Sequence, residues 1–136
     1  MDIVTLQAPF YTGLLAAALM TMQMVLMGMV IKQRLMSQVL IGDGEADLLQ
    51  TIRVHGNFVE NAPIFLVGLA LIEVLVGSNI WVLVMGSVFL VGRVFHAVGM
   101  SITTGPSILR ASGTLASLLV TLVAASYLGY TILQSM

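Results

Sequence analysis

Two groups of polar side chains interrupt apolar stretches of the chain and are suited to binding a charged ligand. The first contains Arg53, Asn57 and Glu60, spaced i, i+4 and i+7, so these residues share one face of a helix. The second contains Arg93 and His96, spaced i and i+3. A charge at the centre of a membrane helix costs roughly 2.5–3.5 kcal/mol, so such residues normally face a protected polar cavity. The two groups therefore predict a buried site for a polar ligand.

The composition predicts an integral membrane protein. The chain has 136 residues, of which 59% are hydrophobic and only 8% are charged. A soluble domain carries about a quarter charged residues, so this chain lacks the polar surface that water requires. The net charge of −1 and the scattered basic residues argue against a nucleic-acid partner. The absence of cysteine excludes disulfides and a cysteine nucleophile, and two histidines on different segments give no metal site.

Four apolar segments are long enough to cross a bilayer, because about 20 helical residues span its hydrocarbon core. We predict spans over residues 8–31, 54–76, 80–100 and 111–133, within a single domain that covers residues 1–136. Connections rich in glycine or polar residues separate the segments. Short connections between such segments predict an all-α, four-helix up-down bundle.

The basic residues predict the orientation of the bundle in the membrane. Arg34 and Arg53 flank the first connection, and Arg110 follows the third, whereas the Gly77–Asn79 turn carries no basic residue. Under the positive-inside rule, the two basic connections lie in the cytoplasm and both termini lie outside. Topology alone is a sufficient explanation for Arg34. Glu73 lies near the outer end of the second span, where we expect it to be interfacial.

The turn around Ser78 gives an estimate of depth. Glu60, Arg93 and His96 lie at similar distances along the chain from this turn, on its two sides. With about 1.5 Å of rise per residue, all three lie near the cytoplasmic ends of adjacent helices. We therefore expect Glu60 to meet Arg93 or His96.

The basic residues at this end suit a small ligand that carries carboxylates. Arg53 and Asn57 line the route to the cytoplasm, and Arg110 opens the last helix on the same side. Arginine binds carboxylates in a bidentate manner. Asn57 and Glu60 can accept hydrogen bonds from an ammonium or amide group. Glutathione combines all of these groups in one molecule.

Each of these residues also has a purely structural explanation. Arg53 can anchor the helix by extending its side chain to the lipid headgroups. A pair between Glu60 and Arg93 can fix the helix register without touching a ligand. His96 can be a hydrogen-bonded packing residue. His55 lies off the helix face that carries Arg53, Asn57 and Glu60, so it can face another helix or subunit.

At these residues the sequence resembles the membrane-associated proteins in eicosanoid and glutathione metabolism, the MAPEG family. The resemblance rests on Arg53-x-His55-x-Asn57-x-x-Glu60-Asn61-x-Pro63 and on Gly92-Arg93-x-x-His96-x-x-Gly99. The stretch Ile41-Gly42-Asp43-Gly44 is similar to the small bacterial branch. With the four spans, the resemblance covers nearly the whole chain.

The resemblance implies a homotrimer in a bacterial inner membrane, with glutathione bound between subunits near the cytoplasmic face. Family enzymes conjugate its thiol to lipophilic electrophiles from the bilayer, reduce lipid hydroperoxides or isomerise endoperoxides. The implied glutathione-binding residues are Arg34, Arg53, His55, Asn57, Glu60, Arg93 and His96. Arg110 matches an arginine credited with stabilising the thiolate and is the expected catalytic residue. No metal is implied.

Two positions depart from some members of the family. Met100 stands where these members have a tyrosine near the thiol, and a thioether has no hydrogen to donate. Gly56 stands where some relatives carry a further arginine. Thiol activation then depends mainly on Arg110, because a neighbouring cation favours the nucleophilic thiolate.

Three functions are compatible with the sequence. The leading one is a glutathione-dependent membrane transferase or peroxidase. The second is a non-catalytic module that binds a thiol or a lipid, with the polar residues serving assembly. The third is a small proton-coupled exporter, which needs a polar path through the outer half, where the sequence offers little beyond Glu73.

Overall fold

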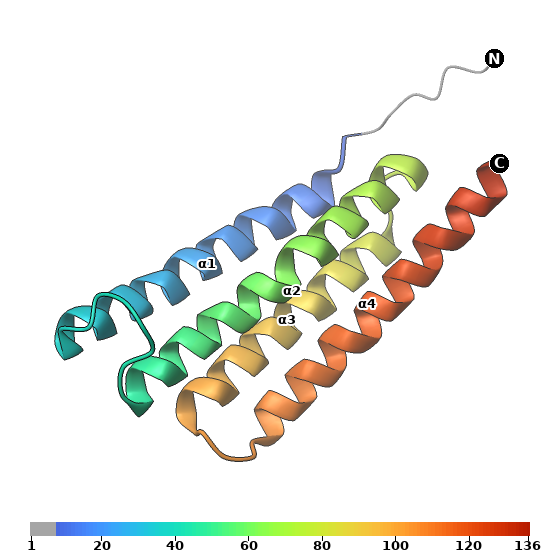
Figure 1. The fold of residues 1–136 in the computed structure, drawn as a ribbon. Coiled ribbons are helices and arrows are strands. Elements are labelled where there is room, and N and C mark those ends of the chain that lie inside the picture. The colour runs from blue at the N-terminus through green and yellow to red at the C-terminus, as the bar shows by residue number, and fades with distance from the viewer. Residues whose placement is uncertain (1–7) are drawn as a thin grey trace.

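The computed structural model describes residues 8–136 and consists of four long helices joined by short connections (Figure 1). The helices are α1 (Phe10–Ser37), α2 (Ala46–Val76), α3 (Ile80–Ile102) and α4 (Ile108–Ser135). Each is long and apolar enough to cross a membrane. Helix α2 begins at Ala46 rather than near Val54, because the polar segment before the apolar stretch is itself helical.

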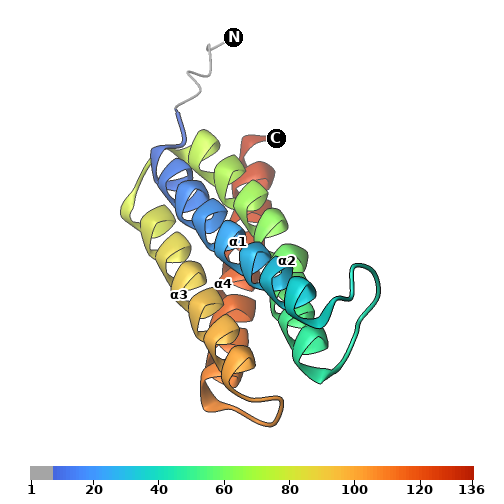
Figure 2. The same ribbon diagram turned by 90° about the vertical axis from the view of Figure 1, so that its left-hand side faces the viewer.

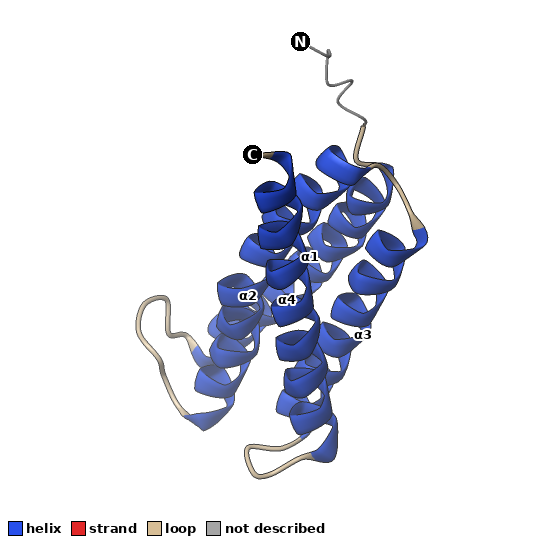
Figure 3. Cartoon of the chain, turned by 90° about the vertical axis from the view of Figure 1, so that its right-hand side faces the viewer, coloured by secondary structure: helices blue, strands red, loops and turns tan. Residues whose placement is uncertain are grey.

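Helices α2 and α3 form the middle of the bundle. Helix α1 packs on both of them from one side, and α4 packs on both from the other. Within residues 8–136, α1 and α4 do not touch each other. The chain runs up and down, so the start of α1 and the end of α4 lie at the same end of the bundle, as Figures 1 and 2 show. The 38–45 and 103–107 connections lie at the opposite end, which we call the loop end (Figure 3).

The apolar core lies where the helices meet. Phe65 of α2 and Phe89 of α3 stack with ring centroids 3.9 Å apart and an interplanar angle of 6°. Leu69, Ile72 and Val82 are fully buried beside them. Many large apolar side chains on the outer faces of α1 and α4 are exposed, which is the arrangement expected of surfaces that face lipid or another protein chain.

Side-chain caps explain where α3 and α4 begin. Asn79 precedes α3, and its side-chain oxygen accepts hydrogen bonds from the backbone N–H groups of Trp81 and Val82. Ser107 precedes α4 and accepts in the same way from the N–H of Arg110, at 3.4 Å. The first turn of a helix lacks internal acceptors for these N–H groups, so both residues stabilise the helix starts. The cap at Ser107 fixes Arg110 in the first turn of α4.

Glu73 lies in the last turn of α2 and is fully buried within the chain, and its position at the membrane interface stays a prediction. Its carboxylate accepts hydrogen bonds from the N–H groups of Tyr11 at 2.9 Å and Thr12 at 2.7 Å, and from the Ser78 hydroxyl. These two N–H groups belong to the first turn of α1, where Pro9 provides no side-chain cap. Glu73 therefore caps α1 from α2 and holds the two helices together.

Replacing Glu73 by leucine is expected to destabilise the bundle by about 2–4 kcal/mol, because two backbone N–H groups and one hydroxyl lose their acceptor in a buried place. Unfolding of the purified protein in mixed micelles, followed by circular dichroism, measures this. Glu73→Gln keeps one acceptor oxygen and should lose less. A Glu73→Leu protein as stable as the parent would contradict the capping role.

Candidate functional site

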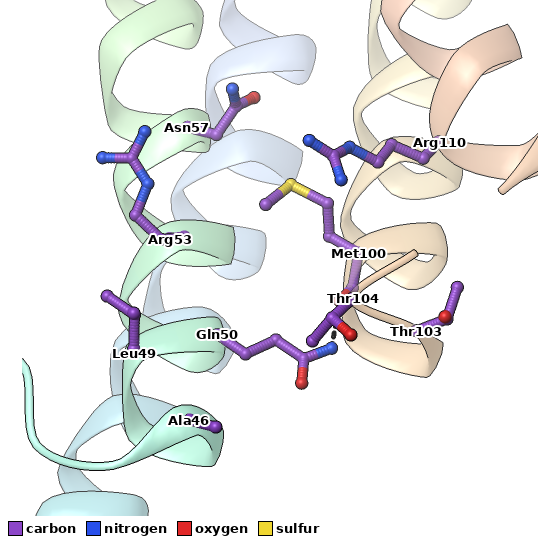
Figure 4. A pocket seen from close by; sticks show the side chains of 9 residues that line it. All are labelled: Ala46, Leu49, Gln50, Arg53, Asn57, Met100, Thr103, Thr104 and Arg110. Atoms are coloured by element: carbon purple, nitrogen blue, oxygen red, sulfur yellow. Dashed lines mark hydrogen bonds between the residues drawn. The ribbon is translucent and has the colours of Figure 1, made fainter. Parts of the chain in front are cut away.

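A cavity of about 320 Å³ opens at the loop end between α2 and the ends of α3 and α4 (Figure 4). Three of its lining residues, Arg53, Asn57 and Arg110, were predicted from the sequence as site residues. The complete lining is Ala46, Leu49, Gln50, Arg53, Asn57, Met100, Thr103, Thr104 and Arg110. The polar side chains of the lining therefore come from α2, from the 103–107 connection and from α4, and α3 contributes Met100.

The α2 wall of the cavity follows from helical spacing. Gln50, Arg53 and Asn57 are spaced i, i+3 and i+7, which places them on one face. In Figure 4 the guanidinium of Arg53 runs along α2 beside Asn57, while Arg110 and Met100 extend toward α2 from the opposite wall. Arg53 and Arg110 are both lining residues, and no acidic side chain is among them. The cavity favours an anion.

Glycines bring α4 against α3 closely enough to place Arg110 at this cavity. A Cβ atom on Gly99 would lie 2.4 Å from the backbone nitrogen of Arg110, and one on Gly113 would lie 2.5 Å from the carbonyl oxygen of Gly92. Such distances leave no room for a side chain. The frequent small residues in the sequence therefore have a specific use here, which is close helix contact.

Arg93 is buried, with 3% of its surface exposed, and its guanidinium donates to the side-chain oxygen of Asn57 at 2.5 Å. The expectation that Glu60 meets Arg93 or His96 is wrong for this single chain. Glu60 is exposed, its carboxylate lies near Gly56, and within residues 8–136 it forms no ion pair. The depth estimate treated both helices as straight and antiparallel, and it cannot resolve the single turn that separates Asn57 from Glu60.

His96 is buried between α3 and α4 and has a defined tautomer. Its Nδ1 lies 2.8 Å from Thr114 Oγ1 and 3.3 Å from the Arg110 carbonyl oxygen. The Thr114 hydroxyl donates its hydrogen to that same carbonyl, at 2.8 Å, so it can only accept from His96. The neutral ring therefore carries its hydrogen on Nδ1. Within residues 8–136, His96 Nε2 and Arg93 Nε have no hydrogen-bond partner.

Two other predicted residues lie away from the cavity in this chain. His55 contacts Gln23 of α1, with 2.9 Å between His55 Nε2 and Gln23 Nε2, so it faces a neighbouring helix. Arg34 donates to the carbonyl oxygens of Val39 at 3.2 Å and Gly42 at 3.1 Å, and so shapes the connection between α1 and α2.

Sequence reasoning missed Gln50 and Thr114. Gln50 donates to the carbonyl oxygen of Met100 at 2.6 Å and so ties α2 to the last turn of α3 beside the cavity. Gln50 could have been predicted from the sequence, because it lies one turn before Arg53 on the same face of α2. Thr114 lies one turn after Arg110, but nothing in its spacing indicated a contact with His96.

The contact between Asn57 and Arg93 is expected to stabilise the bundle cooperatively. Arg93→Leu leaves Asn57 without its donor, and Asn57→Leu leaves a buried guanidinium without an acceptor, so each should cost about 1–3 kcal/mol. The double variant should cost less than the sum of the two, because it leaves no polar group unpaired. Unfolding in mixed micelles of the four proteins measures this coupling, and strictly additive losses would contradict it.

Four helices long and apolar enough to cross a membrane, with a cavity lined by two arginines at one end, are the arrangement expected of a small polytopic membrane protein. The chain belongs to the MAPEG family, whose model matches residues 12–130. It is also similar to the inner membrane protein YecN of Escherichia coli strain K12, with 39% identity over 72 residues. That alignment covers 52% of this chain and 54% of the relative, so it spans about half of each. YecN of Escherichia coli O6:H1 strain CFT073 matches to the same extent.

Proposed function

We propose that this protein is a glutathione-dependent transferase or peroxidase of a bacterial inner membrane. The main structural evidence is the cavity at the loop end, which is lined by Arg53, Asn57 and Arg110. Membership of the MAPEG family supports a glutathione-related activity. In this proposal the loop end faces the cytoplasm, in agreement with its basic residues.

The chemistry assigned to the cavity follows from its charges. Arg53 binds a glutathione carboxylate through its guanidinium fork, and Asn57 is placed beside it. Arg110 stabilises the glutathione thiolate, which is the nucleophile. With an electrophile, the thiolate forms the S–C bond and the leaving group departs as an anion. With a lipid hydroperoxide, two glutathione molecules give the disulfide, an alcohol and water.

We also propose that the active protein is a homotrimer with each site completed by a neighbouring subunit. Glu60, His55 and Arg34 lie outside the cavity of their own chain, so a neighbour is needed for them to reach a ligand. Buried polar atoms normally have partners. Arg93 Nε and His96 Nε2 have no hydrogen-bond partner within the described chain, which favours a ligand or a neighbouring subunit beside these two atoms.

A non-catalytic thiol-binding module is the second candidate, and one observation favours it. Met100 extends into the cavity, and its thioether cannot donate a hydrogen bond to a thiolate (Figure 4). A module of this kind binds glutathione without turning it over.

Two measurements on the purified protein test these proposals. Calorimetric titration with glutathione and with its disulfide measures binding, and an absorbance assay with a chlorinated dinitrobenzene or a lipid hydroperoxide measures turnover. Binding with turnover supports the enzyme, and binding without turnover supports the module. Absence of glutathione binding would refute both.

A further inference from the structure

A second cavity, of about 240 Å³, lies at the loop end between α1, α2 and the end of α3. Gln50 lines both this cavity and the first one, so its side chain stands between them. The polar lining consists of Gln33 from α1, Asp47, Gln50 and Thr51 from α2, and Ser101 from α3. Met29 and Val54 complete the wall.

The hydroxyl groups of this cavity are acceptors only. Thr51 donates its hydroxyl hydrogen to the carbonyl oxygen of Asp47 at 2.9 Å. Ser101 donates its own to the carbonyl oxygen of Ala97 at 2.8 Å. A hydroxyl has one hydrogen and two lone pairs, so both oxygens still have a lone pair to offer but no hydrogen.

The carboxylate has the same character, and each amide can offer its carbonyl oxygen. Gln50 donates one hydrogen of its NH2 group to the Met100 carbonyl, and its Oε1 remains an acceptor. The Asp47 carboxylate accepts only, and Gln33 can turn its carbonyl oxygen inward. Five lining side chains can therefore offer an oxygen acceptor, whereas only the amides of Gln33 and Gln50 have hydrogens to donate, so the cavity suits a donor or a cation.

The charge distribution favours a cation over a neutral donor. Among the lining residues Asp47 is the single charged side chain, and its charge is negative. Ser101 lies in the last turn of α3, which ends at Ile102. The C-terminal end of a helix carries partial negative charge. The first turn of α2 has the opposite polarity, but Asp47 itself occupies that turn.

We propose that this cavity binds a compact monovalent cation, either an alkali ion or a primary ammonium group. One carboxylate with neutral oxygens matches a single positive charge, whereas Ca²⁺ sites gather several carboxylates. Across residues 8–136 no three His, Cys, Asp or Glu side chains converge as they would around a transition metal. A cation on Gln50 Oε1 would fix the amide that holds the end of α3 beside the first cavity. The inference is independent of the function proposed for that cavity.

Sodium-23 NMR of the full-length protein in detergent tests this site. Bound sodium exchanges with free sodium and broadens its resonance, and we expect broadening that saturates and is reversed by potassium or methylammonium. Asp47→Asn should weaken apparent affinity about tenfold or more, because a charge-assisted interaction is lost. The matched control is Asp43→Asn, which removes an acidic residue that does not line the cavity.

The sodium-23 NMR results that support the cation site differ from those that would overturn it. Broadening that Asp47→Asn weakens about tenfold or more and Asp43→Asn preserves supports the site. The more effective competitor shows whether an alkali ion or an ammonium group is preferred. Equal broadening in both variants, or none in the parent protein, overturns the proposal. Thr51→Val removes one acceptor and keeps the side-chain shape, so it provides a second test if Asp47→Asn does not fold. It should weaken sodium binding several-fold, and unchanged binding would count against the site.

Discussion

Replacement of Arg110 by alanine is expected to lower kcat for glutathione conjugation about 10²–10³-fold, the usual loss when one preorganised electrostatic contact is removed from an active site. Arg110 extends into the cavity from α4, opposite Asn57 and beside Met100 (Figure 4). Since Met100 has no hydrogen to donate, the proposed mechanism relies on Arg110 to stabilise the thiolate. Initial rates with a chlorinated dinitrobenzene, measured across pH, provide the test.

Two control variants separate thiolate stabilisation from binding. Arg53→Ala should mainly raise KM for glutathione, because Arg53 is assigned to a carboxylate that is bound equally before and during the reaction. Arg110→Lys keeps the charge but loses the planar fork, so it should retain part of kcat. The ultraviolet absorbance of the bound thiolate should fall in Arg110→Ala. An unchanged kcat and thiolate signal in that variant would remove Arg110 from the mechanism.

Patterns within one helix could be predicted from the sequence. The apolar segments gave four helices, and the turn residues gave the three connections. The spacing of Arg53 and Asn57 correctly placed both on one face of α2, and the 103–107 connection returned Arg110 to the same end as these two. All of these inferences need only the geometry of a helix and the direction of the chain.

Contacts between helices were harder to predict, because they depend on tilt and on small shifts along the helix axes. Arg93 bonds Asn57 instead of meeting Glu60, which lies one turn further along α2. Glu73 caps the start of α1 from α2, a pairing that the sequence spacing does not indicate. A shift of one turn is enough to exchange such partners.

Glycine positions illustrate the same limit. The sequence contains many small residues in apolar segments, and spacing does not distinguish those in close contact from those facing open space. Gly113 and Gly99 lie against the backbone of the neighbouring helix, whereas Gly129 has no atom within 4 Å of its Cβ position. Only the crossing of α3 and α4 decides which glycine cannot be replaced.

Gly113→Ala is expected to destabilise the bundle by about 1–3 kcal/mol, the usual cost of overpacking. The new Cβ would lie 2.5 Å from both the Gly92 carbonyl oxygen and the His96 nitrogen, and these backbone atoms cannot move without shifting a helix. Because His96 and Arg110 are joined across the same contact, glutathione affinity should fall as well. Gly129→Ala, in the same helix, should be neutral or stabilising by up to about 1 kcal/mol. Unfolding in mixed micelles and calorimetric titration of both variants measure these effects, and equal stability of the two would show that α3 and α4 do not need this close approach.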